Sequence, residues 1–81
     1  MNRLGLIILV ILRNNSALSP STAISLYEIK DFAKLTYSIT TIYRTIKLLL
    51  EEGLIQVGLK DSKSQTFYIS LEGLNLIKEI R

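Results

Sequence analysis

One segment, residues 38–55, constrains the fold of this chain more than any other. Aliphatic side chains recur in it at helical spacing, at Ile39, Ile42, Ile46 and Leu49. At roughly 100° per residue they fall on one narrow stripe, whereas the opposite side is basic and rich in hydroxyl groups. Such a helix packs its apolar stripe on a core and leaves the other face outside. The segment therefore predicts an amphipathic helix with an outward face that is available for binding.

Both ends of this helix carry boundary signals. Ser38 can accept a hydrogen bond from the first free backbone amides as the N-cap residue. Gly53 suits the left-handed conformation that ends many helices. Directly after it the period changes to two, because Ile55, Val57 and Leu59 alternate with other residues. We therefore expect a helix that is followed at once by a strand.

The composition limits the classes of protein that the chain can belong to. Its 81 residues make one small domain, residues 1–81, with a thin core. The absence of cysteine and histidine removes thiolate nucleophiles, disulfides and the usual zinc ligands, so we expect no enzyme, metal or cofactor. Because 48% of the residues are hydrophobic, we expect a second copy to cover part of the surface. The net charge of +3 permits a nucleic-acid partner.

The first helix is predicted over residues 3–14 and is apolar nearly all round. Its apolar run, residues 4–12, has the length of the hydrophobic region of a signal peptide. However, Arg13 and two asparagines follow it, where a signal peptide has small residues before its cleavage site. It is also shorter than the roughly 20 residues that span a bilayer. A buried helix explains it better, with one side on the core and the other on a partner. We expect a cytoplasmic protein without a membrane partner.

A loop and a second helix follow. Residues 16–22 contain a proline and form the predicted loop. Ser25 and Glu28 have the spacing of a capping box, so the next helix should start at Leu26 and end near Leu35. A three-residue turn then leads into the third helix, as in a helix-turn-helix. The residues expected to face inward are Leu26, Ile29, Phe32 and Ala33.

The C-terminal part predicts a hairpin and a last helix. A second alternating run, residues 66–69, follows a polar tip at 60–64. Ser70 can cap a helix from Leu71 to about Ile80. In this helix Leu74 and Ile77 should face the core, while Leu76 and Ile80 point elsewhere. The expected fold class is α+β and mostly helical, with three helices, a two-stranded β-hairpin and a C-terminal helix.

This order of elements resembles the winged helix-turn-helix repressors, especially the PadR-like and MarR-like families. The resemblance rests on residues 27–30 (Tyr-Glu-Ile-Lys), 41–44 (Thr-Ile-Tyr-Arg), 51–55 (Glu-Glu-Gly-Leu-Ile) and 68–74 (Tyr-Ile-Ser-Leu-Glu-Gly-Leu). It covers most of the chain from Leu4 to Ile80. The chain also looks like small winged helices of thermophilic archaea and their viruses, for which the compartment would be the host cytoplasm.

The chain departs from these families in two places. The loop at residues 16–22 is longer than their usual link between the first two helices. The long C-terminal helices by which the repressors dimerise and bind effectors have no counterpart in this sequence. We therefore expect no small-molecule effector, and a homodimer formed by the first and last helices. The residues predicted for that interface are Leu6, Leu9, Leu76 and Ile80.

The resemblance implies double-stranded DNA as the partner, with the start of the third helix in the major groove. Arg44 is the predicted base reader, because a guanidinium can bond guanine at two points. Thr40 and Thr41 can offer hydroxyls or a methyl group, and Ser38 and Lys47 are predicted phosphate contacts. The alternative for the two basic residues is a solvated helix face, paired with a glutamate one turn on.

Other predicted contacts lie outside that helix start. Lys60 and Lys63 at the hairpin tip would touch phosphates or the minor groove, and Lys30 and Lys34 would touch phosphates from the second helix. The alternative for all four is an ordinary solubilising role. Tyr43 on the helix flank can contact DNA or simply pack.

Three functions remain open from the sequence. The first is a homodimeric, sequence-specific transcriptional regulator. The second is a winged helix that serves as a protein-interaction module, which Leu48 favours because this apolar residue points away from the buried stripe. The third is an architectural DNA binder without sequence preference.

Overall fold

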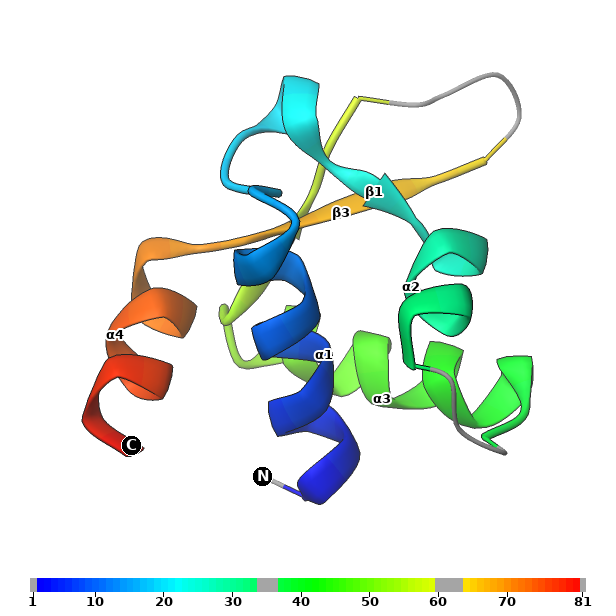
Figure 1. The fold of residues 1–81 in the computed structure, drawn as a ribbon, viewed down its shortest axis with the longest axis horizontal. Helices are drawn as coiled ribbons and strands as arrows, with labels where there is room; N and C mark the ends of the chain where they lie inside the picture. Colours follow the sequence, from blue (N-terminus) through cyan, green and yellow to red (C-terminus); the bar gives the residue numbers. More distant parts are fainter. Residues whose placement is uncertain (1, 34–36, 60–63, 81) are drawn as a thin grey trace.

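The computed structural model describes residues 2–33, 37–59 and 64–80 (Figure 1). For Glu79 and Ile80 it describes the backbone alone. The elements are α1 (Arg3–Asn14), a 3₁₀ turn η1 (Pro20–Thr22), β1 (Ile24–Ser25), α2 (Leu26–Ala33), α3 (Ile39–Glu51), β2 (Ile55–Val57), β3 (Thr66–Ile69) and α4 (Leu71–Ile80). This order confirms the mostly helical α+β fold. In the described part of the chain, no helix is long and apolar enough to cross a membrane.

The helix α1 lies at the centre of the molecule. It crosses α3, with α2 on one side and α4 on the other, and the sheet lies beyond its C-terminal end (Figure 1). Its neighbours in the same chain therefore account for much of its apolar surface. The largest fully buried side chains are Ile8, Leu9, Leu12, Ile29, Ile42, Ile46, Leu49, Ile55, Phe67 and Ile69.

The sheet has one more strand than the sequence predicted. β3 lies between β1 and β2 and is antiparallel to both, with Ile24 opposite Phe67 and Ile55 opposite Ile69. The third strand was missed because β1 is only two residues long, too short to show an alternating pattern. It ends at Ser25, which pairs with β3 and also caps α2.

Two predicted caps are confirmed and connect the elements. The Ser25 amide donates to Glu28 Oε1 at 3.0 Å and the Glu28 amide donates to Ser25 Oγ at 3.2 Å, which completes the capping box. The Gly73 amide donates to Ser70 Oγ at 3.1 Å. The same Ser70 hydroxyl donates to the Gly53 carbonyl at 2.6 Å, so the start of α4 is bonded to the end of α3.

Gly73 shows how closely these two helix ends approach each other. A Cβ atom built on it would lie 2.3 Å from the Leu54 carbonyl oxygen. Any side chain at this position would therefore push α4 away from the chain that leaves α3. Only glycine allows the packing seen here.

Three apolar side chains differ from their predicted positions. Phe32 was expected inward but is 46% exposed, because Ile29 and Ala33 occupy the inner side of the short α2. Leu9 was predicted at a dimer interface but is fully buried in the core of the single chain, which contradicts that assignment. Leu76 is half-buried and packs against the core, so it is less outward than expected.

Candidate nucleic-acid interface

The helix α3 has the boundaries and the buried stripe that the sequence predicted. The Thr41 amide donates to Ser38 Oγ at 3.2 Å, which confirms the N-cap. Gly53 has φ +75°, the left-handed conformation expected after the helix end. On the inner side, Ile42, Ile46 and Leu49 are at most 1% exposed, and Ile39 is half-buried. Since this stripe is fixed in the core, the direction of the opposite side is fixed as well.

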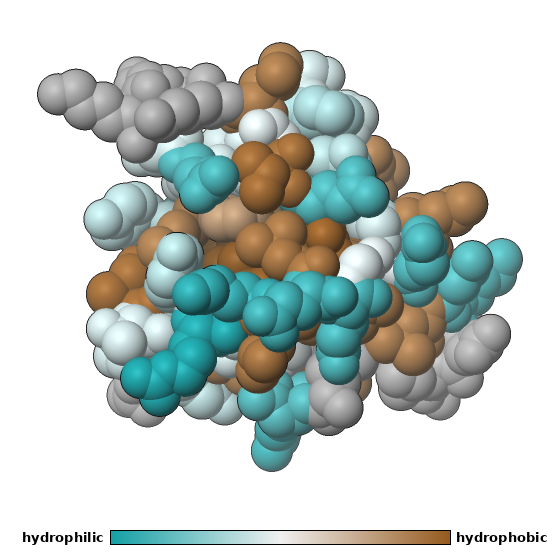
Figure 2. All heavy atoms as spheres, turned by 180° about the vertical axis from the view of Figure 1, so that it is seen from behind, coloured by the Kyte–Doolittle hydropathy of each residue, from teal (hydrophilic) through white to brown (hydrophobic). Residues whose placement is uncertain are grey.

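The outward face of α3 carries half of the residues that were predicted to bind DNA. Its exposed members are Thr40, Thr41, Tyr43, Arg44, Lys47 and Leu48. Seen from behind the view of Figure 1, hydrophilic atoms form a belt across the lower half of the molecule, where α3 lies, and hydrophobic atoms gather beside it (Figure 2). The outward face of α3 is therefore polar, and the surface next to it is apolar.

Specific contacts order some of these side chains. The Lys47 ammonium lies 5.8 Å from the centre of the Tyr43 ring, within the range of a cation–π interaction. Tyr43 thus holds a cation in place on the outward face. The hydroxyls of Ser38 and Thr41 are 3.0 Å apart and share a hydrogen bond, so both belong to the cap as well as to the surface.

Thr45 is a residue of this helix that the sequence interpretation missed. It is 6% exposed, and its hydroxyl donates to the Thr41 carbonyl at 3.1 Å. The burial of Thr45 could have been predicted from its helical position, which is at the edge of the aliphatic stripe. The bond satisfies the buried hydroxyl within the helix, so Thr45 belongs to the packed side of α3.

The predicted contacts outside α3 have different outcomes. Lys30 is half-buried, and its ammonium donates to the Tyr37 carbonyl at 3.2 Å, which bonds α2 to the entry of α3. Lys30 thus has a structural role beside its predicted phosphate contact. The other three lysines, Lys34, Lys60 and Lys63, lie outside the described residues, and so does the side chain of Ile80.

A recess lies between α2, α3 and β3, and the sequence did not reveal it. We call it the tyrosine recess. Its volume is about 360 Å³ and its lining residues are Leu26, Tyr27, Tyr43, Ser64, Gln65 and Phe67. Since they come from three separate parts of the chain, no local pattern could have brought them together. The recess adds Tyr27 to the surface next to the outward face of α3.

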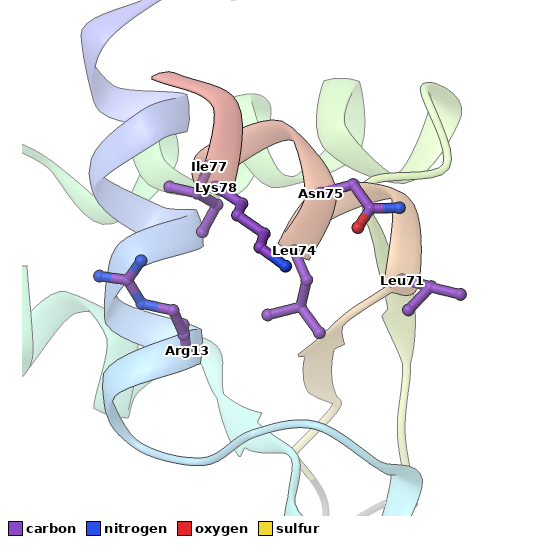
Figure 3. A pocket seen from close by; sticks show the side chains of 6 residues that line it. All are labelled: Arg13, Leu71, Leu74, Asn75, Ile77 and Lys78. Carbon is purple, nitrogen blue, oxygen red and sulfur yellow. The ribbon is translucent and has the colours of Figure 1, made fainter. Parts of the chain in front are cut away.

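A second hollow lies at the other end of the molecule, between α1 and α4. This α1–α4 groove has a volume of about 540 Å³ and is lined by Arg13, Leu71, Leu74, Asn75, Ile77 and Lys78 (Figure 3). Figure 1 shows α4 and the start of α3 at opposite ends of the long axis. The groove is thus separate from the candidate interface, although it also carries two cations.

In the parts of the chain that are described, no metal centre offers an alternative to a nucleic-acid interface on α3. No group of three or more histidine, cysteine, aspartate or glutamate residues gathers there in a way that could hold a metal ion. The exposed cations, hydroxyls and aromatic rings around α3 suit a phosphate-rich partner instead.

The helix pair α2 and α3, followed by the antiparallel strands β2 and β3, defines a winged helix-turn-helix protein. No family model matches the chain. The DNA-binding protein TubR of Clostridium botulinum C phage is 32% identical over 73 residues, which cover 90% of this chain and 88% of that protein. The chain belongs to the TubR family of DNA-binding proteins.

Two solved structures support the fold. TubR from Bacillus megaterium pBM400 superposes with a TM-score of 0.86 at 22% identity, over 99% of this chain and 86% of that chain. PadR from Bacillus subtilis, in complex with operator DNA, superposes with a TM-score of 0.74 at 21% identity, over 99% of this chain and 46% of that chain. The predicted resemblance to PadR-like proteins is thus confirmed at the level of the fold.

Proposed function

We propose that this chain is a sequence-specific, double-stranded DNA-binding protein that regulates transcription as a homodimer. The observation that carries the proposal is the fixed orientation of α3. Its aliphatic stripe is buried, so Arg44 and Lys47 project from the opposite side. The 32% identity to a DNA-binding protein over most of the chain supports the same conclusion.

The residues of α3 divide by their chemistry. An exposed arginine near the start of a helix can bond the O6 and N7 atoms of guanine, and this is the proposed role of Arg44. Thr40 lies one turn earlier and offers its hydroxyl or its methyl group to a neighbouring base. Lys47 lies one turn later, where its ammonium neutralises a phosphate. Ser38 and the hairpin lysines, Lys60 and Lys63, complete the proposed backbone contacts.

A second copy is proposed to cover an apolar groove along α1 and α2. The groove has a volume of about 290 Å³, and its lining includes Leu6, Ile7, Val10 and Phe32. Phe32 is 46% exposed in the single chain, and burial of such a side chain is favourable. In this arrangement Leu6 lies in the dimer interface, as the sequence predicted. The two α3 helices of the dimer would read two DNA half-sites about one helical turn apart.

The dimer is tested by a charge placed in this groove. Phe32→Glu should shift the protein from dimer to monomer in sedimentation equilibrium, because a carboxylate would be buried at the interface. The matched control is Leu71→Glu, since Leu71 is 70% exposed on α4 and lies outside this groove. A native protein that is monomeric at all concentrations would contradict the homodimer.

Selection of bound sequences from a random DNA pool tests the whole proposal. We expect a recurring site with two-fold symmetry, whose half-sites contain the guanine that Arg44 reads. Retention of DNA without any recurring sequence would instead establish an architectural binder. Absence of retention at low salt would refute DNA binding.

One observation favours a second candidate function, a protein-interaction module. Leu48 is 52% exposed on α3 and lines a small recess of about 80 Å³ with Asn2, Gly5 and Glu52 among its neighbours. An apolar side chain on this face does not help to bind phosphates. A protein complex that is insensitive to salt and lost in Leu48→Glu, with no DNA retention, would establish this function instead.

A further inference from the structure

The tyrosine recess combines donors of hydrogen bonds with an apolar floor. Tyr27 is 64% exposed and Tyr43 is 46% exposed, and both line it. Ser64 and Gln65 add a hydroxyl and an amide, while the buried Phe67 supplies apolar surface. The donors are neutral, and the lining residues include no acid.

This chemistry matches one repeating unit of the DNA backbone. A phosphate accepts hydrogen bonds from tyrosine, serine and glutamine side chains as well as from cations. The deoxyribose ring has an apolar side that can lie on an apolar floor. Glu28, the acidic residue next to Tyr27, is turned to the amide of Ser25 at 3.0 Å and is absent from the lining. The carboxylate of Glu28 is therefore engaged elsewhere.

The position of the recess fits the same ligand. It lies between the first turn of α2, the first half of α3 and the start of β3, on the side of the molecule where α3 begins (Figure 1). Tyr43 belongs both to the recess and to the outward face of α3. A helix that enters a major groove is flanked by the two phosphate strands of that groove. One of these strands must therefore pass along the elements beside α3.

We propose that the tyrosine recess holds one sugar–phosphate unit of the DNA strand beside α3, with the Tyr27 hydroxyl donating to a phosphate oxygen. The inference rests on the proposed DNA binding and adds a contact that no local sequence pattern marked. Because the donor is neutral and touches only the backbone, it contributes equally at all sequences and releases no counterion.

The test is Tyr27→Phe, which removes one oxygen atom from an exposed side chain and leaves the fold unchanged. Dissociation constants are measured for a selected site and for an unrelated duplex over a series of salt concentrations. We expect binding to weaken about three- to tenfold on both duplexes, which is the size of the net contribution of one typical hydrogen bond at an exposed position. The slope of log K against log salt should stay as in the native protein, because no charge is lost.

Tyr68→Phe is the matched control. Tyr68 follows Phe67 in β3, so its side chain lies on the other side of the sheet, and its hydroxyl donates to Gln56 Oε1 at 2.6 Å. This variant should bind both duplexes as the native protein does. In ethylation interference, Tyr27→Phe should lose sensitivity at one phosphate per half-site, and Tyr68→Phe at none.

Each other outcome overturns the inference in a recognisable way. Native affinity of Tyr27→Phe on both duplexes would show that the recess holds no phosphate, while DNA binding itself would stand. A loss confined to the selected site would show that Tyr27 reads a base. If the native protein retains neither duplex, the proposed function fails first and the recess contact fails with it.

Discussion

The two ends of this molecule both carry exposed cations beside a hollow, yet they differ in what surrounds those cations. At one end, Arg44 and Lys47 stand on a helix whose back is locked in the core, next to a recess with neutral donors. At the other end, Arg13 and Lys78 flank a groove whose other lining residues are mostly leucine and isoleucine. Positive charge is therefore common to both ends, and the projecting helix with its hydroxyls distinguishes one of them.

The contrast teaches that charge alone does not identify the interface. A net charge of +3 is small for a nucleic-acid-binding domain. Cations scattered at random over the surface would be found as often away from the DNA interface as on it. What distinguishes the α3 end is shape, because a convex helix fits the major groove and a concave apolar groove does not. Variants matched between the two ends can break or sharpen this comparison.

The largest expected effect concerns the serines that cap α3 and α4. Ser70 is 5% exposed and bonds both Gly73 and the Gly53 carbonyl, whereas the exposed Ser38 has only its cap contacts. Ser70→Ala should cost about 2–3 kcal/mol of unfolding free energy, because a partly buried carbonyl also loses its partner. Ser38→Ala should cost about 1 kcal/mol. Urea denaturation measures both, and equal losses would contradict the account of the α3–α4 connection.

The next effect compares two exposed arginines. Arg44→Ala should lower the affinity for the selected site by about 1–3 kcal/mol and leave non-specific affinity nearly unchanged, because a base contact is lost. Arg13→Ala at the α1–α4 groove should change neither. Gel-shift titrations of both variants on the same two duplexes give the comparison. If Arg13→Ala has the larger effect, the interface has been placed at the wrong end.

The smallest effect compares two lysines by the salt dependence of binding. Lys47→Gln should reduce the slope of log K against log salt by about 1, since one phosphate contact is lost. Lys78→Gln removes the same charge from α4 and should leave the slope as it is. Fluorescence anisotropy over a salt series resolves the two slopes. Equal reductions would mean that the cations act through overall charge only.

The sequence was sufficient wherever the determining interactions are local. The cap at Ser38, the capping box of Ser25 and Glu28 and the glycine at position 53 each act within one helical turn, and all of them are confirmed. The aliphatic stripe of α3 is likewise a property of consecutive turns. For this reason the order of elements and the start of α3 could be predicted without the structure.

Features that depend on distant segments could not be predicted in this way. β1 is a strand only because β3 pairs with it. Phe32 has helical spacing for burial but is left outside, because the inner side of α2 is already filled by Ile29 and Ala33. The tyrosine recess brings Tyr27 next to Tyr43, and this depends on how α2 and α3 are packed.

The most direct test of the central claim is an amide NMR titration of the native protein with its selected duplex. The account predicts that the resonances of residues 38–47, and those of Tyr27 and Gln65 beside the tyrosine recess, shift together, while those of Leu74 and Lys78 in the α1–α4 groove do not. Shifts concentrated in the α1–α4 groove, with α3 unaffected, would contradict the assignment of α3 as the DNA-reading helix.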